Sequence, residues 1–144
     1  MKNITKKMKI NIAPFLKLIQ VKHQRNKEDT TELSNGFPRL YWNEVNTYIT
    51  LMKKEIDEMS EEIKKENMVY LEDELWDIFW DYLNILYILK DEGYIEDYAH
   101  IFKESKKKFT QRIHADLEGI SWQDVKKKQK KTLLKRHEKK YGKK

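Results

Sequence analysis

The sequence contains no cysteine, which excludes a disulfide framework, a thiol nucleophile and a metal site built on thiolates. Glycine and proline are scarce, with four and two residues in 144, whereas a many-stranded sandwich or barrel needs a turn about every 8–12 residues. No apolar run approaches the roughly 18 residues of a membrane span. The apolar stretch 10–21 is interrupted by Lys17 and lacks a small-residue cleavage site. We therefore expect neither signal peptide nor membrane anchor, and a cytoplasmic location.

Charge, in contrast, is abundant: 38% of the residues are charged and 39% are hydrophobic. The net charge of +6 is unevenly spread, because residues 1–36 carry +5, residues 37–102 carry −10 and residues 103–144 carry +11. An acidic middle followed by a basic end indicates either a cation-loaded site flanked by anion-binding side chains or a basic tail that meets nucleic acid. A merely solubilising tail is the third interpretation of the last 20 residues.

Apolar residues recur at steps of three and four along most of the chain, and strand patterns are absent. The sequence therefore predicts an all-α protein, an antiparallel bundle of about four to five helices. We expect helices at about 10–26, 45–66, 70–92 and 95–113, and a last basic helix opened by a capping box at Ser121. We expect a basic, partly helical segment at 1–36, a central helical domain at 37–118 and a basic helix or tail at 119–144.

The helix at 70–92 is apolar on nearly all sides, which predicts a place in the middle of the bundle. It nevertheless carries Glu74, Asp77, Asp81 and Asn84 within one stripe about 80° wide. Buried carboxylates repel one another and are costly to desolvate, unless a cation compensates them. Either a Lys or Arg side chain or a bound metal ion would supply that positive charge.

The preceding helix carries Glu55 and Glu58 on one flank. A short connection makes the two helices antiparallel, so these residues should approach Glu74 and Asp77. Four carboxylates without a basic residue in the same stripes suit Mg²⁺ or Mn²⁺, which prefer carboxylate and water ligands. None of the four histidines is spaced to share a zinc ion with another, and no glycine-rich phosphate loop is present.

The pair Glu55-Ile-Asp-Glu58 and Glu74-Leu-Trp-Asp77 resembles the ExxE…ExxD signature of the MazG-like, all-α nucleoside triphosphate pyrophosphohydrolases. ELWD stands where that family usually has ELGD, so a Trp side chain replaces a glycine. Further on, Lys108-Phe-Thr-Gln-Arg112 resembles the KFxxR element of many members. The resemblance spans about residues 42–112.

This resemblance implies hydrolysis of an NTP or dNTP between its α and β phosphates, to a nucleoside monophosphate and pyrophosphate. It implies Mg²⁺, with Mn²⁺ as a substitute, held by the four carboxylates of the paired motif. Either Asp81 or a spare Glu such as Glu62 would orient the attacking water. Lys108 and Arg112 are the candidates for binding the phosphates. Arg112 would make a bidentate contact, and Lys108 would act as a point charge.

The nucleobase needs an aromatic or apolar slot. Five aromatic residues near the motif are candidates: Trp42, Trp76, Trp80, Tyr82 and Phe109. For any single one of them, a place in the core or at a subunit interface is the commoner role. Asn84 lies one turn beyond the carboxylates and is a candidate for a hydrogen bond to the base or the sugar.

Two non-enzymatic interpretations compete with this one. A basic helical protein could bind nucleic acid through phosphate contacts, or a helical adaptor could pair its carboxylates with lysines of a partner. The first of these, binding to nucleic acid, leaves the acidic middle of the chain unexplained.

Assembly is the first testable prediction. Trp76, Trp80 and Tyr87 lie within about 40° of one another on the helical wheel, and such a strip exposed on a monomer would be an unusually large apolar patch. We therefore expect a homodimer, or a dimer of dimers, as in members of the family. Light scattering should report at least twice 17.6 kDa, and Trp80→Glu should dissociate the assembly and reduce activity. An active wild-type monomer would contradict this expectation.

Overall fold

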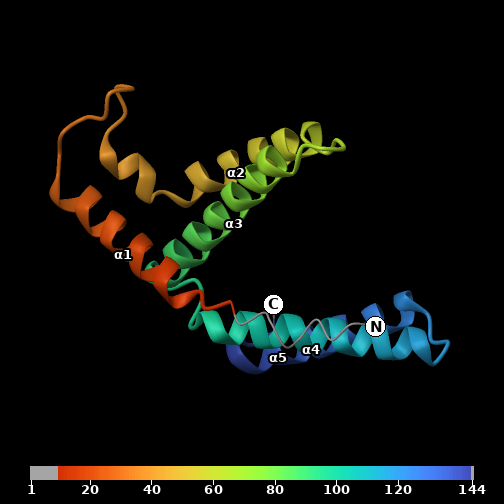
Figure 1. The fold of residues 1–144 in the computed structure, drawn as a ribbon. Coiled ribbons are helices and arrows are strands. Elements are labelled where there is room, and N and C mark those ends of the chain that lie inside the picture. The colour runs from red at the N-terminus through yellow and green to blue at the C-terminus, as the bar shows by residue number, and fades with distance from the viewer. Residues whose placement is uncertain (1–9, 144) are drawn as a thin grey trace. The chain divides into compact units, whose positions relative to one another are not determined.

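The structure is a computed structural model that describes residues 10–143. In this part of the chain there are five α-helices, one short 3₁₀ helix and no strand apart from a single bridge between Glu32 and Pro38 (Figure 1). The helices are α1 (Ala13–Glu28), η2 (Arg39–Asn43), α2 (Val45–Glu61), α3 (Met68–Asp91), α4 (Tyr98–Leu117) and α5 (Trp122–Tyr141). The all-α prediction is confirmed, and every helix expected from the sequence is present.

The helices end where the sequence provides the means to end them. Gly93 follows α3 with φ +79°, a left-handed conformation that glycine adopts at little cost. Ser121 caps α5 as expected, since its hydroxyl oxygen accepts a hydrogen bond from the Asp124 amide at 3.1 Å. Between α2 and α3, the side-chain nitrogen of Asn67 donates to the Glu62 carbonyl oxygen at 2.9 Å and holds the connection closed.

The chain forms two compact units, the first ending at Ile95 and the second beginning at Glu96. The second unit consists of α4 and α5 side by side (Figure 1). Arg136 on α5 pairs with Glu104 on α4 at 2.8 Å. The boundary between the units falls inside the segment 37–118 that the sequence suggested as one domain, and that division stays a prediction.

In the first unit, α2 and α3 run antiparallel and side by side, and α1 packs against α3 (Figure 1). The core lies where these helices meet, around Ile19 of α1, Tyr48 of α2 and Leu83 of α3, each at most 2% exposed. Burial of such side chains is worth about 1.5–3 kcal/mol each. Because α1 contributes to this core, it fixes one wall of the space beside the α2–α3 pair.

Helix α3 has the expected place in the middle of the bundle along only part of its length. Its C-terminal half is buried, whereas Leu75 and Trp76 in its N-terminal half are exposed, Trp76 by 72%. Aromatic contacts between α1 and α3 run from Phe79 to Tyr87 only. The turns before Phe79 therefore have α2 on one side and no comparable cover from α1.

The predicted strip of exposed aromatic residues is also only partly present. The Tyr87 ring lies 4.8 Å from the His23 ring of α1, and the half-buried Trp80 lies below the Lys22 ammonium group. Helix α1 thus covers two members of the strip and leaves Trp76 exposed. Trp76 instead lines a second, mainly apolar cavity of about 350 Å³ together with Phe15. The homodimer stays a prediction, and Trp76 is the member of the strip that is most exposed.

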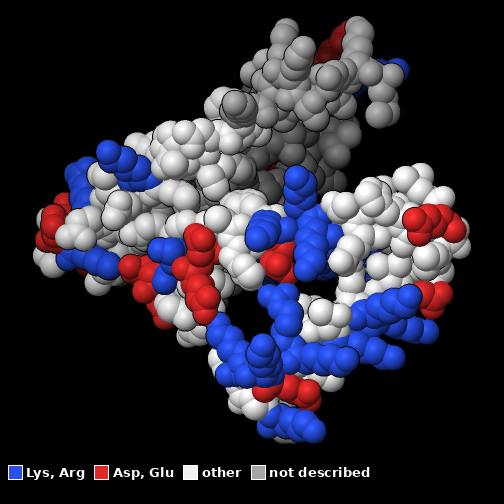
Figure 2. All heavy atoms as spheres, turned by 90° about the horizontal axis from the view of Figure 1, so that it is seen from below, with Lys and Arg blue, Asp and Glu red and all other residues white. Residues whose placement is uncertain are grey.

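The basic character of the C-terminal part lies on the surface. Most lysines of α5 are exposed, and Figure 2 shows a face of the molecule on which Lys and Arg side chains outnumber acidic ones. Exposure suits both a solubilising and an anion-binding role for this helix. Among the described residues, no helix has the length and apolar character required to cross a membrane.

Candidate metal centre

Three glutamates meet across the α2–α3 pair. Glu55 and Glu58 are one turn apart on the same face of α2, and the antiparallel packing brings Glu74 of α3 opposite them. One carboxylate oxygen from each of the three lies within 4.8 Å of the other two. The structure thus brings together three of the four carboxylates that the paired motif singled out.

The geometry of this cluster fits a divalent cation. Oxygen ligands of Mg²⁺ or Ca²⁺ lie about 2.0–2.6 Å from the ion, so two ligands of one ion are at most roughly 4–5 Å apart. The second oxygen of Glu74 is buried and, among the described residues, has no hydrogen-bond partner. An unpartnered buried carboxylate oxygen is costly in the absence of a positive charge. The donor set, hard oxygens alone, favours Mg²⁺ or Mn²⁺ over a softer metal.

The pKa values of Glu55 and Glu58 reflect the repulsion among the carboxylates of the cluster. Burial and the hydrogen bond with Glu58 raise the pKa of Glu55 to about 7, helped by Glu74 and by the charge of Asp77. The pKa of Glu58 is lowered instead, because its carboxylate accepts hydrogen bonds from Lys54, 3.0 Å away, and from Glu55. The cluster therefore favours the protonated form of Glu55, hydrogen-bonded to Glu58, and a bound cation would relieve the same repulsion.

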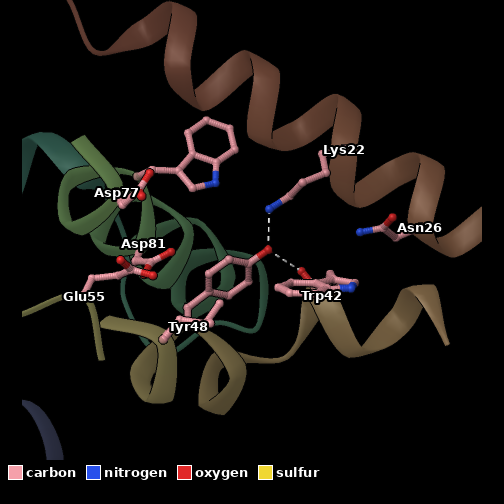
Figure 3. A pocket seen from close by; sticks show the side chains of 9 residues that line it. Lys22, Asn26, Trp42, Tyr48, Glu55, Asp77 and Asp81 are labelled. Atoms are coloured by element: carbon pink, nitrogen blue, oxygen red, sulfur yellow. Dashed lines mark hydrogen bonds between the residues drawn. The ribbon is translucent and has the colours of Figure 1, made fainter. Parts of the chain in front are cut away.

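A cavity of about 400 Å³ adjoins the cluster. Figure 3 shows Glu55, Asp77 and Asp81 on one side of it and Lys22 and Trp42 on the other. Such a volume is within the range of small-molecule sites. The cavity therefore offers space for a ligand in direct continuation of the carboxylates.

Asp77 and Asp81 continue the acidic stripe along the cavity, but they differ in burial. Asp77 is exposed, contrary to the prediction of a stripe buried throughout, and its pKa is raised by burial of the carboxyl group and by the charges of Asp73 and Glu58. Asp81 is only 5% exposed, and one of its oxygens has no partner among the described residues. Burial and the charge of Asp77 raise the pKa of Asp81 to about 6, against the opposing effect of Lys22.

Lys22 of α1 is the cavity residue that sequence reasoning missed. Its ammonium group donates hydrogen bonds to the Tyr48 hydroxyl and to the Asn84 side-chain oxygen. Burial lowers the pKa of Lys22 to about 8, although the charge of Asp81 acts in the opposite direction. The signal in the sequence was weak: Lys22 lies three residues after the buried Ile19, on the face of α1 that packs inward.

The two residues predicted to contact the base lie at different depths. Trp80 lines the cavity, as expected of a residue that could stack on a ligand. Asn84 is fully buried (0% exposed); its amide nitrogen donates to the Trp80 carbonyl oxygen at 2.9 Å and its oxygen accepts from Lys22. Both ends of the Asn84 amide thus already have protein partners.

Comparison with known families identifies this arrangement. Residues 43–116, just over half of the chain, match the MazG nucleotide pyrophosphohydrolase domain. The chain belongs to the MazG family. The resemblance seen in the paired motif is thereby confirmed, and the matched segment contains all five acidic site residues from Glu55 to Asp81. No curated protein and no solved structure gives a significant match to the chain.

The MazG segment also includes Lys108 and Arg112, which lie on α4 in the second unit. The Arg112 guanidinium donates to the Gln129 side chain at 2.9 Å and lies 5.3 Å from the Trp122 ring and 5.5 Å from the Phe109 ring. Arg112 thus has a place in the α4–α5 packing, and its predicted contact with phosphates stays a prediction.

The raised pKa values lead to a testable prediction about stability. The folded chain holds protons on Glu55 and Asp81 more tightly than the unfolded chain does, so without metal these two carboxyl groups lower the free energy of unfolding as the pH rises from about 4 to about 7. Burial lowers the pKa of His23 to about 4, which acts in the opposite sense over the same range. The contribution of the carboxyl groups is therefore the difference between the wild type and the Glu55→Gln and Asp81→Asn variants, whose free energy of unfolding should fall less with rising pH. Above that range the carboxylates are charged, and millimolar Mg²⁺ should raise the melting temperature by mass action. Thermal unfolding followed by circular dichroism, with EDTA or Mg²⁺, measures both effects.

Glu72→Gln, which removes an exposed carboxylate of α3 outside the cluster, is the matched control and should keep the response to Mg²⁺. A wild-type melting temperature that is indifferent to Mg²⁺ at neutral pH would count against the metal centre.

Proposed function

We propose that the chain is a Mg²⁺-dependent nucleotide pyrophosphohydrolase that converts a (d)NTP into the (d)NMP and pyrophosphate, with Mn²⁺ able to replace Mg²⁺. The observation that carries the proposal is the cluster of Glu55, Glu58 and Glu74, whose oxygens lie within 4.8 Å of one another beside a cavity of about 400 Å³. Membership of the MazG family supports the same class of reaction.

Glu55, Glu58, Glu74 and Asp77 would hold the cation: oxygens of the three glutamates lie within 4.8 Å of one another, and Asp77 is the fourth proposed ligand, at the wall of the adjoining cavity. A divalent ion, when bound, neutralises phosphate charge and makes a water molecule more acidic. The carboxylates by themselves would repel a triphosphate, which carries about four negative charges. A cluster of this composition therefore selects a substrate that arrives together with divalent cations.

Asp81 is the residue best placed to accept the proton of the attacking water. Its pKa of about 6 leaves it ionised at neutral pH, yet basic enough to take up a proton. One of its oxygens lacks a partner among the described residues, and the residue lines the cavity. In the proposed step, the water oxygen bonds to the α phosphorus, the bond to the leaving pyrophosphate breaks, and the proton passes to Asp81.

The alternative base considered from sequence, Glu62, has another role in the structure. Its carboxylate accepts a hydrogen bond from the Asn67 side chain at the α2–α3 connection. It does not belong to the carboxylate cluster or line the cavity. The geometry therefore favours Asp81 over Glu62.

Trp80, which lines the cavity, would contact the nucleoside. We propose that Asn84, which is fully buried, acts by holding Lys22 rather than by touching the substrate. Lys108 and Arg112 remain the proposed phosphate contacts of the second unit.

The direct test is a panel of NTPs and dNTPs incubated with Mg²⁺, with pyrophosphate and phosphate measured separately. We expect pyrophosphate and the matching monophosphate in equal amounts. Glu74→Gln and Asp77→Asn should lower turnover by at least about a hundredfold with helix content unchanged, because the charge serves the metal and not the fold.

Glu72→Gln, on an exposed position of the same helix, should leave turnover close to that of the wild type. Release of phosphate alone would show that a different bond is cut, and turnover within about tenfold of wild type in both ligand variants would refute the assignment of Glu74 and Asp77.

A further inference from the structure

Lys22 is a cation placed inside the cavity by a helix that precedes the MazG segment. Figure 3 shows its side chain reaching from α1 into the cavity toward the Tyr48 hydroxyl. The ammonium group lies 4.5 Å from the centre of the Tyr48 ring and 5.2 Å from that of the Trp80 ring. Hydrogen bonds to Tyr48 and Asn84 and the Trp80 ring thus fix the position of this otherwise flexible side chain.

The groups that hold Lys22 are themselves fixed. The Tyr48 hydroxyl donates to the Trp42 carbonyl oxygen at 2.7 Å, so it accepts from Lys22 with its remaining capacity. The Asn84 amide is anchored on the Trp80 carbonyl oxygen. An ammonium group has three N–H donors and no acceptor. Two of these donors go to Tyr48 and Asn84, and among the described residues the third has no hydrogen-bond acceptor.

Lys22 is too far along the helices to belong to the metal cluster. Its partner Tyr48 comes seven residues before Glu55 on α2, and its partner Asn84 comes seven residues after Asp77 on α3. Seven residues correspond to a rise of about 10 Å in an α-helix. Lys22 and Trp42 line the same cavity as Glu55 and Asp77. A nucleotide with its phosphates at the carboxylates would therefore extend its sugar and base along the cavity toward Lys22 and Trp42.

We propose that the remaining N–H of Lys22 donates a hydrogen bond to a ring carbonyl oxygen of the nucleobase. The site then favours bases with a keto oxygen, as in uracil and hypoxanthine, over bases with an amino group at the same position, as in cytosine and adenine. The inference rests on the proposed nucleotide substrate and adds its base selectivity. If an amino group faced Lys22, two hydrogen-bond donors would face each other and neither would have an acceptor. In a partly buried site, unpaired donors of this kind weaken binding strongly.

The experiment compares substrates that differ by this one exchange of oxygen for an amino group. The binding of dUMP and dCMP, and of dIMP and dAMP, is measured by calorimetry in the presence of Mg²⁺, and kcat/KM is measured for the corresponding triphosphates. The wild type should prefer the keto member of each pair by about tenfold or more. Lys22→Met should bring both ratios close to one, mainly by weakening the keto member.

Two further variants make the result specific. Lys22→Gln keeps an N–H donor without the charge and should retain part of the preference, which also guards against failure of Lys22→Met to fold. Lys27→Met removes an exposed lysine of the same helix that pairs with Asp91 at 3.5 Å, and it should leave both ratios unchanged.

Equal losses for both members of a pair in Lys22→Met would assign Lys22 to the phosphates or the sugar and overturn the proposal. A wild type that prefers dCMP and dAMP, or that binds none of the monophosphates, would overturn it as well. Discrimination in binding without any release of pyrophosphate from the triphosphates would refute the proposed hydrolysis and still support the base contact of Lys22.

Discussion

Repulsion among carboxylates across the α2–α3 pair is the constraint on which the site depends. Glu55, Glu58 and Glu74 are brought together by two helices whose short connection forces them to run antiparallel. Part of the repulsion is relieved because the raised pKa of Glu55 favours its protonated form and because Glu58 pairs with Lys54. One buried oxygen of Glu74 still has no hydrogen-bond partner in the described part of the chain. A divalent cation would satisfy all three groups at once.

The cavity separates two kinds of charge along one line. Carboxylates occupy the end near Glu55 and Asp77, and the single ammonium group among the residues that line it, that of Lys22, occupies the end near Trp42. A nucleoside triphosphate with bound cations has the complementary order, because its cations lie at the phosphates, where they can face the carboxylates, and its base offers hydrogen-bond acceptors to Lys22. The order of charges along the cavity thus agrees with the reaction class of the MazG family. It also favours one orientation of the substrate, with the phosphates near Glu55 and Asp77 and the base near Lys22.

The helices and the carboxylate cluster could be predicted because both follow from local spacing. Steps of three and four residues define α2 and α3, and the same steps place Glu55 with Glu58 and Glu74 with Asp77. The connection between the helices then leaves one way to bring the pairs together. The residue at the opposite end of the cavity could not be predicted in this way. Lys22 reaches Tyr48 and Asn84, 26 and 62 residues away in sequence, only because α1 docks on α3.

The docking of α1 on α3 also explains why only part of the predicted aromatic strip is exposed. The contacts of α1 with α3 include polar groups, such as His23 against Tyr87 and Lys22 above Trp80. A hydrophobic pattern does not reveal that such residues cover an aromatic strip. Trp80 was expected at a subunit surface as well as near the base. The structure places it in the cavity wall, and its contact with a second subunit stays a prediction.

Binding of Mn²⁺ measured by electron paramagnetic resonance tests the central claim most directly, because ions bound to the protein lose the sharp signal of free Mn²⁺ and no turnover is required. The wild type should remove Mn²⁺ from solution at neutral pH, Glu55→Gln and Glu74→Gln should bind it at least about tenfold more weakly, and Glu72→Gln should bind it as the wild type does. A wild-type protein that leaves all Mn²⁺ free, or a Glu74→Gln variant with undiminished binding, would contradict the assignment of these carboxylates to a metal ion.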